Sequence, residues 1–451
     1  MREKVHHQLP LVAPLIEHRH AVELEAMSAR LDALPEAMDL VLADLASGLK
    51  DVSRGRRGMS AETVLRALVV KQLRGFSYEE LAFHLADSNS YRRLCRIGFT
   101  DKAPSASALQ RDIKKIRAET IERVNRMLLG EAASANIEKG RMVRVDCTVT
   151  QTNIHQPSDS ELLWDCNRVL LRLMARGHKL VRLRFSNRSL AARRRRLDIL
   201  NAKGDKARRK GYVALLDITR EVVAAAQEGV RRLVALVSDD RAAVAAAHAL
   251  AEDLQHFADL ARRVIDQTHR RVLRGERVPA QDKVLSIFEP HTDVIVKKRR
   301  ETEYGHKLCI ASGPSGLVTD LVVEGGNPAD STLALHMIER QHQIYGRPPR
   351  QVAFDGGFAS KKNLADIKSL GVKDVAFSKR RGLKVLDMVK SCWVYQKLYR
   401  FRAGIEAGIS LLKRCFGLDR CNCKGFASFR AYAWASVLAA NLLTLARYGP
   451  A

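Results

Sequence analysis

The sequence YRFRAGIEAGISLLK, residues 399–413, predicts the helix around which the rest of the chain is organised. At about 100° per residue, one face of this helix carries four polar side chains. They are Tyr399, Arg402, Glu406 and Lys413. Isoleucines and leucines form an apolar flank with which the helix would lie against a sheet. An acid between two cations suits phosphodiester chemistry, because a carboxylate binds metal ions and cations bind phosphate.

Two further acids follow short apolar segments that have the pattern of strands. Residues 142–145 lead into Asp146, and residues 352–354 lead into Asp355, which is followed by two glycines that allow a tight turn. We expect a strand to end at each aspartate. An acid at a strand end is more often a turn former or cap than a ligand. The two become a site only if they converge with Glu406 at one sheet edge.

Three carboxylates at one edge can hold two Mg²⁺ ions about 4 Å apart, one activating the attacking oxygen and the other stabilising the leaving oxygen. The set contains oxygen ligands without His or Cys, which favours Mg²⁺ or Mn²⁺ over zinc. We therefore predict Asp146, Asp355 and Glu406 as catalytic and metal-binding residues.

The composition indicates the class of partner. The 451 residues include 77 Lys and Arg against 50 Asp and Glu, a net charge of +27. Such a charge commits the chain to a polyanion, most commonly nucleic acid. Ribosomal and membrane-surface proteins share such a charge but rarely this length with 46% hydrophobic residues. The length suggests two to four domains.

Several features predict a cytoplasmic protein without a membrane span. Residues 1–10 are polar and charged, unlike a signal peptide, and the eight scattered cysteines suit reduced thiols. The longest apolar run, residues 431–446, is shorter than a bilayer span and contains Asn441, so it predicts a buried C-terminal helix.

Helical patterns dominate residues 1–140. A capping box of Ser77 and Glu80 starts one helix, and a box of Ser107 and Gln110 is predicted to start a later one. The basic residues of the later helix are Arg111, Lys114, Lys115 and Arg117. Short helices ending in a basic one resemble a helix-turn-helix bundle that binds DNA. An ordinary helical domain with solvated charges is an equal alternative.

Residues 161–283 are predicted to be entirely helical. Residues 168–210 contain 16 Lys and Arg against two acids. The densest run is Arg193, Arg194, Arg195 and Arg196. A charge run is usually a solvated face, but beside a phosphodiester site this density favours contact with a DNA backbone. Trp164 would either stack on a displaced base or be buried.

Strand patterns resume at residue 284. Strands are expected at 294–296, 307–311 and 317–323, the last two joined by a hairpin turn at 313–316. A helix over 331–345 follows, and a helix over 361–370 with a strand over 374–377 completes a strand-helix-strand unit after residues 352–354. These alternating strands and helices predict the α/β class for this part of the chain.

In combination, these motifs resemble the DDE transposases of bacterial insertion sequences. The resemblance is to the subgroup whose last acid lies in a Y-x2-R-x3-E-x6-K signature, which residues 399–413 match in full. Asp146 looks like the family's first aspartate, and Asp355, in FDGGFAS, looks like its second. Residues 68–99 look like the helical DNA-binding region that precedes these catalytic domains.

The resemblance implies three domains. An N-terminal helical DNA-binding domain would occupy residues 1–140. An RNase H-like catalytic domain, an α/β fold with a mixed sheet flanked by helices, would be formed by 141–160 and 284–451. It would be interrupted by the basic helical insertion 161–283. The implied activity is metal-dependent cleavage at the insertion-sequence ends and transfer of the freed 3′ hydroxyl into target DNA. Bringing two ends together implies at least a homodimer on DNA, nucleoid-associated in a bacterial cytoplasm.

The resemblance also implies roles for single residues. Asp146 and Asp355 would bind metal jointly, and Glu406 would complete the site. Arg402 and Lys413 would contact phosphate or orient the glutamate. Tyr399 would position DNA. His306 is a weaker candidate near the site, and we expect it to be a surface histidine.

Two other functions suit the same residues. A nuclease of the same fold would need the three carboxylates but would neither recognise element ends nor transfer strands. A catalytically silent relict would bind DNA only, although the intact carboxylates argue against it.

Overall fold

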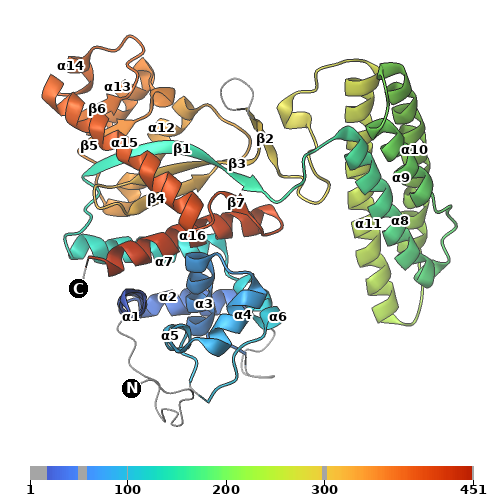
Figure 1. Ribbon diagram of the computed structural model, residues 1–451, viewed down its shortest axis with the longest axis horizontal. Coiled ribbons are helices and arrows are strands. Elements are labelled where there is room, and N and C mark those ends of the chain that lie inside the picture. Colours follow the sequence, from blue (N-terminus) through green and yellow to red (C-terminus); the bar gives the residue numbers. More distant parts are fainter. Residues whose placement is uncertain (1–17, 49–57, 99, 297–301, 449–451) are drawn as a thin grey trace, which may run out of the picture. The chain divides into compact units, whose positions relative to one another are not determined.

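The computed structural model describes residues 18–48, 58–98, 100–296 and 302–448 (Figure 1). The chain forms two compact units. The first comprises Met1–Gln151 and His306–Ala451, and the second comprises Thr152–Gly305. Residues 1–10, in which we expect no signal peptide, lie outside the described residues.

The described strands form one mixed sheet with the hydrogen-bonded order β2-β3-β1-β5-β6, in which β4 also pairs with β3 and β7 with β1. The strands are β1 (Met142–Thr152), β2 (Asp293–Val296), β3 (Thr302–Ser312), β4 (Val318–Val323), β5 (Gln351–Phe354), β6 (Asp374–Phe377) and β7 (Arg420–Cys421). Strands β1, β5 and β6 are parallel, whereas β4 runs antiparallel to β3. This is the RNase H-like arrangement predicted from the sequence.

Helices flank the sheet of the first unit (Figure 1). They are α12 (Asp330–Tyr345), α13 (Lys361–Ser369), α14 (Val385–Met388) and α15 (Cys392–Cys415). Helix α15 packs on β5 and β6. It contains the predicted helix 399–413 and begins earlier, because the Ser391 hydroxyl caps its first turn by accepting from the Val394 amide. The predicted hairpin of β3 and β4 and the β5-α13-β6 unit are confirmed.

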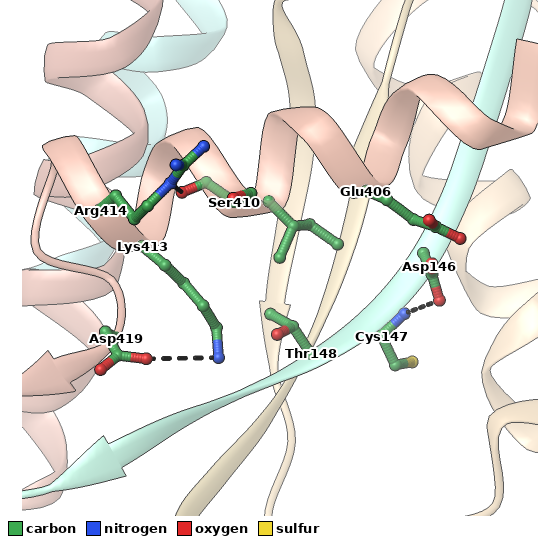
Figure 2. A pocket seen from close by; sticks show the side chains of 9 residues that line it. Asp146, Cys147, Thr148, Glu406, Ser410, Lys413, Arg414 and Asp419 are labelled. Carbon is green, nitrogen blue, oxygen red and sulfur yellow. Dashed lines mark hydrogen bonds and ion pairs between the residues drawn. The ribbon is translucent and has the colours of Figure 1, made fainter.

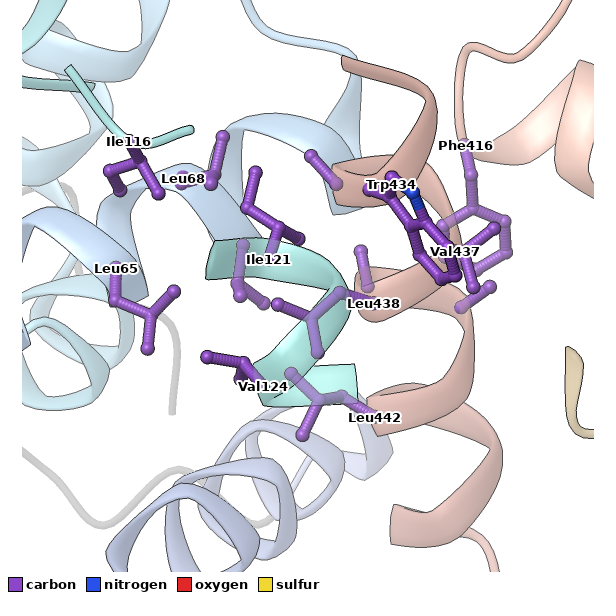
Figure 3. Packing of buried hydrophobic residues seen from close by; sticks show 14 of the residues in the cluster. Leu65, Leu68, Ile116, Ile121, Val124, Phe416, Trp434, Val437, Leu438 and Leu442 are labelled. Atoms are coloured by element: carbon purple, nitrogen blue, oxygen red, sulfur yellow. The ribbon is translucent and has the colours of Figure 1, made fainter. Parts of the chain in front are cut away.

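The N-terminal helices of the first unit are α1 (Arg19–Asp32), α2 (Pro35–Ala46), α3 (Ala61–Arg74), α4 (Tyr78–Asp87), α5 (Asn89–Leu94), α6 (Ala106–Ile113) and α7 (Ala118–Ser134). The C-terminal helix α16 (Phe426–Ala446) packs against α1, α3 and α7. Figure 3 shows Leu438 and Leu442 of α16 packed with Ile121 and Val124 of α7. The predicted buried C-terminal helix is thus confirmed.

A buried amide fixes α16 in this core. The Asn441 side chain accepts a hydrogen bond from the Val318 amide and donates to the Val318 carbonyl, at 2.9 and 2.8 Å. It also donates to the Asn125 side chain of α7 at 2.8 Å. Since buried polar groups need partners, these contacts set the register between α16, α7 and β4. None of the helices in the described part of the chain is long and apolar enough to cross a membrane.

The helix starts in this region were predicted with mixed success. The capping box of Ser77 and Glu80 is present at the start of α4. The box of Ser107 and Gln110 is wrong, because Ser105 caps α6 by accepting from the Ala108 amide. Helix α6 ends at Ile113, so Lys114 is its C-cap and the predicted basic residues Lys115 and Arg117 lie beyond its end.

The second unit contains a helical bundle. Its long helices are α8 (Asp159–Val181), α9 (Ser189–Leu200), α10 (Asp205–Val234) and α11 (Arg241–Thr268), followed by a π-helical turn, His269–Leu273, and a 3₁₀ turn, Ala280–Asp282. In its core, the Asn167 side chain donates to the Thr219 hydroxyl at 2.8 Å, joining α8 to α10. Trp164 is half-buried and packs against the same apolar core.

Candidate active site

Asp146 and Asp355 are adjacent because of the parallel register. Strand β1 pairs with β5 up to Val145 and Phe354, which face each other in the ladder. Asp146 and Asp355 directly follow this last pair, so both acids lie side by side at the same edge, just beyond the β1–β5 ladder. The prediction that a strand ends at Asp355 is confirmed, but the same prediction for Asp146 is wrong. Strand β1 continues to Thr152, since its later residues pair elsewhere in the sheet.

The Asp146 side chain is mostly buried. One carboxylate oxygen accepts from the Cys147 amide at 2.8 Å. Burial raises the pKa of Asp146 to about 6, and the nearby charges of Asp355 and Glu406 act in the same direction, against the Cys147 amide and Arg402. Above this pKa the group is mainly a carboxylate, which favours a cation beside it.

Asp355 is better supplied with donors. The Ser378 hydroxyl donates to its Oδ1 atom at 2.8 Å. Burial acts to raise the pKa of Asp355, but Ser378, the amides of Gly356 and Gly357, and Arg402 outweigh it, so the pKa lies below its usual value. The two glycines after Asp355 thus supply backbone donors as well as the turn.

Helix α15 is anchored over β1 by Arg144, two residues before Asp146 and on the same face of the strand. The Arg144 guanidinium donates to the Ser312 hydroxyl at 2.8 Å and to the Phe401 carbonyl at 3.1 Å, and it lies over the Phe401 ring. A Cβ atom at Gly404 would lie 2.0 Å from Nη1 of Arg144. Gly404 therefore permits the close approach that sets α15 beside the aspartates.

Arg402 of α15 joins the three acids. Its Nη2 atom donates to Oε1 of Glu406 at 2.7 Å. Its Nη1 atom lies 3.4 Å from Oδ1 of Asp355 and 3.8 Å from Oδ2 of Asp146. Only 15% of the Arg402 side chain is exposed, compared with 62% for Glu406. The structure thus gathers the three predicted acids around one guanidinium.

An open cleft of about 560 Å³ extends from Asp146 and Glu406 along α15 (Figure 2). It is lined by Asp146, Cys147, Thr148, Glu406, Ile409, Ser410, Lys413, Arg414 and Asp419. Lys413 stands in the cleft with its Nζ atom 3.6 Å from Oδ1 of Asp419 and has no contact with the three acids among the described ion pairs. The cleft thus joins Asp146 and Glu406 to Lys413, Arg414 and Asp419.

Two other candidate residues, Tyr399 and His306, differ in their surroundings. Tyr399 is half exposed on α15, its ring 6.3 Å from the ring of Tyr395. The expectation that His306 is a surface histidine is wrong. It is 1% exposed, and its ring lies 4.9 Å from that of Phe426 and 4.8 Å from that of Phe429. Packing against these two aromatic rings therefore explains the burial of His306 on β3.

The arginine run of the second unit lies on α9. Arg193, Arg194 and Arg195 are exposed, while Arg196 is half-buried. Arg195 pairs with Asp198 at 2.9 Å, and Arg196 pairs with Glu161 of α8 at 2.9 Å. Arg193 and Arg194 have no ion pair within the described residues, so their charges face solvent.

The acids suit a divalent metal by chemistry. Their ligand atoms are all carboxylate oxygens, the type that Mg²⁺ and Mn²⁺ prefer. One guanidinium can contact all three, so they surround a place that a cation occupies. In the part of the chain that the structure describes, no group of three or more His, Cys, Asp or Glu side chains is close enough to hold a metal directly. Arg402 lies among the three acids instead.

Sequence reasoning missed the supporting residues Arg144, Ser378 and Gly404. The period-2 alternation of a strand could have placed Arg144 on the face of Asp146. Ser378 directly follows β6, as Asp355 directly follows β5, and Phe354 pairs with Phe377. That alignment was available from the predicted strand-helix-strand unit.

Comparisons with known families agree with this fold. Residues 262–442 match the family described as Transposase DDE domain, and residues 16–115 match the family described as Transposase domain (DUF772). The first segment includes Asp355 and Glu406, whereas Asp146 lies between the two segments. No curated protein and no solved structure matches the chain.

The two matched segments together span more than half of the chain, and both describe transposases. The chain therefore carries a transposase DDE domain and a second transposase domain. The DDE transposase family binds DNA and generally uses divalent metal ions.

Proposed function

We propose that this chain cleaves DNA at the ends of an insertion sequence and transfers the freed 3′ hydroxyl into target DNA. The observation that carries the proposal is the convergence of Asp146, Asp355 and Glu406 on the Arg402 guanidinium. Two-metal phosphodiester chemistry requires carboxylates that converge in this way, here from strand β1, from the residue after β5 and from helix α15.

Each residue has a proposed role. Asp146, Asp355 and Glu406 would hold two Mg²⁺ ions, or Mn²⁺ ions. When bound, these ions would polarise the scissile phosphate and lower the pKa of the attacking hydroxyl. Lys413 lines the same cleft as Asp146 and Glu406 and would bind a DNA phosphate, and Tyr399, exposed on the same helix, would position the strand.

The other regions have roles in binding DNA. Residues 1–140 would recognise element ends, while Arg193, Arg194, Arg195 and Arg196 of the insertion 161–283 would contact the backbone, because their helix is densely basic. Two ends must be held together for strand transfer, so the active form would be at least a homodimer on DNA. Its place would be the bacterial cytoplasm, bound to the nucleoid.

The test is an incubation of the purified full chain with plasmid DNA that carries the flanks of its own gene, in Mg²⁺ or EDTA, with new 3′ ends mapped to the nucleotide. Metal-dependent cuts at defined flanking positions, absent with Asp146→Asn, support the transposase. Joined products containing a flank end and target sequence support strand transfer.

The same assay separates the two alternatives. Scattered metal-dependent cuts would favour a nuclease of the same fold. Binding without cuts under Mg²⁺ or Mn²⁺ would favour a DNA-binding relict. Either result would overturn the proposal.

A further inference from the structure

Arg402 has an unusual position for a residue expected to bind DNA phosphate. Within the described residues it alone pairs with all three acids of the site, at 2.7 Å to Glu406, 3.4 Å to Asp355 and 3.8 Å to Asp146. Its side chain is mostly shielded from solvent. In this arrangement the guanidinium faces carboxylates and is not presented to a ligand.

The three contacts differ in quality. The bond to Glu406 has the length of a strong charge-assisted hydrogen bond, which is about 2.7–2.9 Å. Both aspartates share the single Nη1 atom at longer distances. The buried Nε atom makes no hydrogen bond within the described protein. The guanidinium is therefore held firmly by the glutamate and loosely by the aspartates.

Charge gives a reason for the arrangement. Three ionised carboxylates that lie close together repel one another, and the Arg402 guanidinium in contact with all three offsets this repulsion. One arginine leaves the four side chains with two net negative charges. A single divalent ion neutralises these, whereas two ions beside Arg402 would leave excess positive charge. Arg402 and a metal ion compete because the guanidinium lies against the same carboxylate oxygens that would bind the ion.

We propose that Arg402 is a positioning residue that serves as the counter-ion of the three acids before metal binds. When DNA binds, the guanidinium pairs with a DNA phosphate instead and leaves the three acids free for metal. Metal binding and DNA binding are then coupled, and the protein without DNA binds metal weakly. This inference rests on the proposed function, since it concerns the same acids.

The test is a titration of the full chain with Mn²⁺ in the absence of DNA, following unbound Mn²⁺ by electron paramagnetic resonance. Arg402→Gln is expected to bind Mn²⁺ at least about fivefold more tightly than the wild type, at the lower end of typical coupling between sites. Lys413→Gln is the matched control, because it removes the same charge from the same helix but from a residue paired with Asp419.

Other results of the same titration would overturn the inference. If Arg402 only braces the acids, Arg402→Gln lets them separate and Mn²⁺ binding is unchanged or weaker, which overturns the inference. An equal gain in Lys413→Gln also overturns it, because the effect would then be one of net charge. If Arg402→Gln lacks a cooperative unfolding transition and is therefore misfolded, Arg402→Lys is titrated in its place. A lysine ammonium cannot span three acids, so an affinity above the wild type is expected, and no gain contradicts the inference.

Addition of a short DNA duplex tests the coupling. It should raise the Mn²⁺ affinity of the wild type more than that of Arg402→Gln, in which the competitor is already gone. An equal rise in both proteins contradicts the coupling. Asp355→Asn separates this inference from the proposed function. If Asp355→Asn leaves Mn²⁺ affinity unchanged, the metal site itself is wrong, whereas a loss of affinity there without a gain in Arg402→Gln refutes only the role of Arg402.

Discussion

Arg402 in the first unit and the run Arg193–Arg196 in the second are both parts of a strongly basic chain, but their partners differ. Arg402 meets acids from β1, from the end of β5 and from its own helix. In the run, Arg195 pairs within α9 and Arg196 with the neighbouring α8. Arg193 and Arg194 face solvent, with no ion pair in the described part of the chain.

The difference shows what a count of charges leaves out. On α9 the cations outnumber the acids, and exposed ion pairs contribute only about 0–1 kcal/mol, so these arginines remain available to phosphate. At the sheet edge the acids outnumber the cation, and the site lacks positive charge. A chain with net charge +27 thus contains one place that is suited to a cation.

The largest effect should come from the acids. Asp146→Asn, Asp355→Asn and Glu406→Gln keep side-chain size but remove the charge that holds metal, so each should lower DNA cleavage by about a thousandfold or more. Gel-shift affinity for the flanking DNA should stay nearly unchanged. Loss of DNA binding in all three variants would point to a role in folding instead.

A second effect concerns the support of the site. Arg144→Met removes one hydrogen bond to the Phe401 carbonyl of α15 and one to the Ser312 hydroxyl of β3, and it should destabilise the protein by about 1–3 kcal/mol, measured by urea unfolding. Cleavage should fall as well, because α15 carries Glu406. Arg194→Met, on the solvent face of α9, is the matched control. Equal destabilisation by both variants would remove the distinction between the two regions.

The arginine run should affect binding without affecting chemistry. Arg193→Gln combined with Arg194→Gln should weaken DNA binding several-fold and reduce the slope of log K against log salt concentration by about 2, one for each phosphate that is no longer neutralised. The cleavage rate of saturated complexes should not change. An unchanged salt slope would mean that this part of α9 does not touch DNA.

The smallest effect is expected at a paired arginine of the same run. Arg195→Gln breaks the exposed pair with Asp198, and the free energy of unfolding should change by less than about 1 kcal/mol. Thermal unfolding measures this directly. A larger decrease in stability would show that the exposed pairs of α9 support the bundle.

Much of the fold could be predicted because local patterns specify it. The strand before Asp355, the strand β6 and the hairpin all follow from apolar segments bounded by turn residues. The full length of β1 could not, because threonines beyond Asp146 are equally suited to a loop and become a strand only through pairing. The burial of His306 depends on α16, more than a hundred residues away.

The site shows the same division. Its three acids could be predicted from their place after strands or on a helix face. The position of Arg402 among them could not, because the signature places its side chain on the face of Glu406 without saying what lies opposite. That depends on Arg144 and Gly404, which determine how closely α15 approaches β1.

The central claim is that Asp146, Asp355 and Glu406 together bind the divalent ion. The most direct measurement is calorimetric titration of Mn²⁺ into the wild type and into Asp146→Asn, Asp355→Asn, Glu406→Gln and Asp419→Asn, with DNA present. Asp419 lines the same cleft but pairs with Lys413, so it is the control. Each of the first three variants should lose at least about tenfold in affinity or one bound ion, while Asp419→Asn stays like the wild type. Unchanged binding in the three, or an equal loss in Asp419→Asn, would contradict the claim.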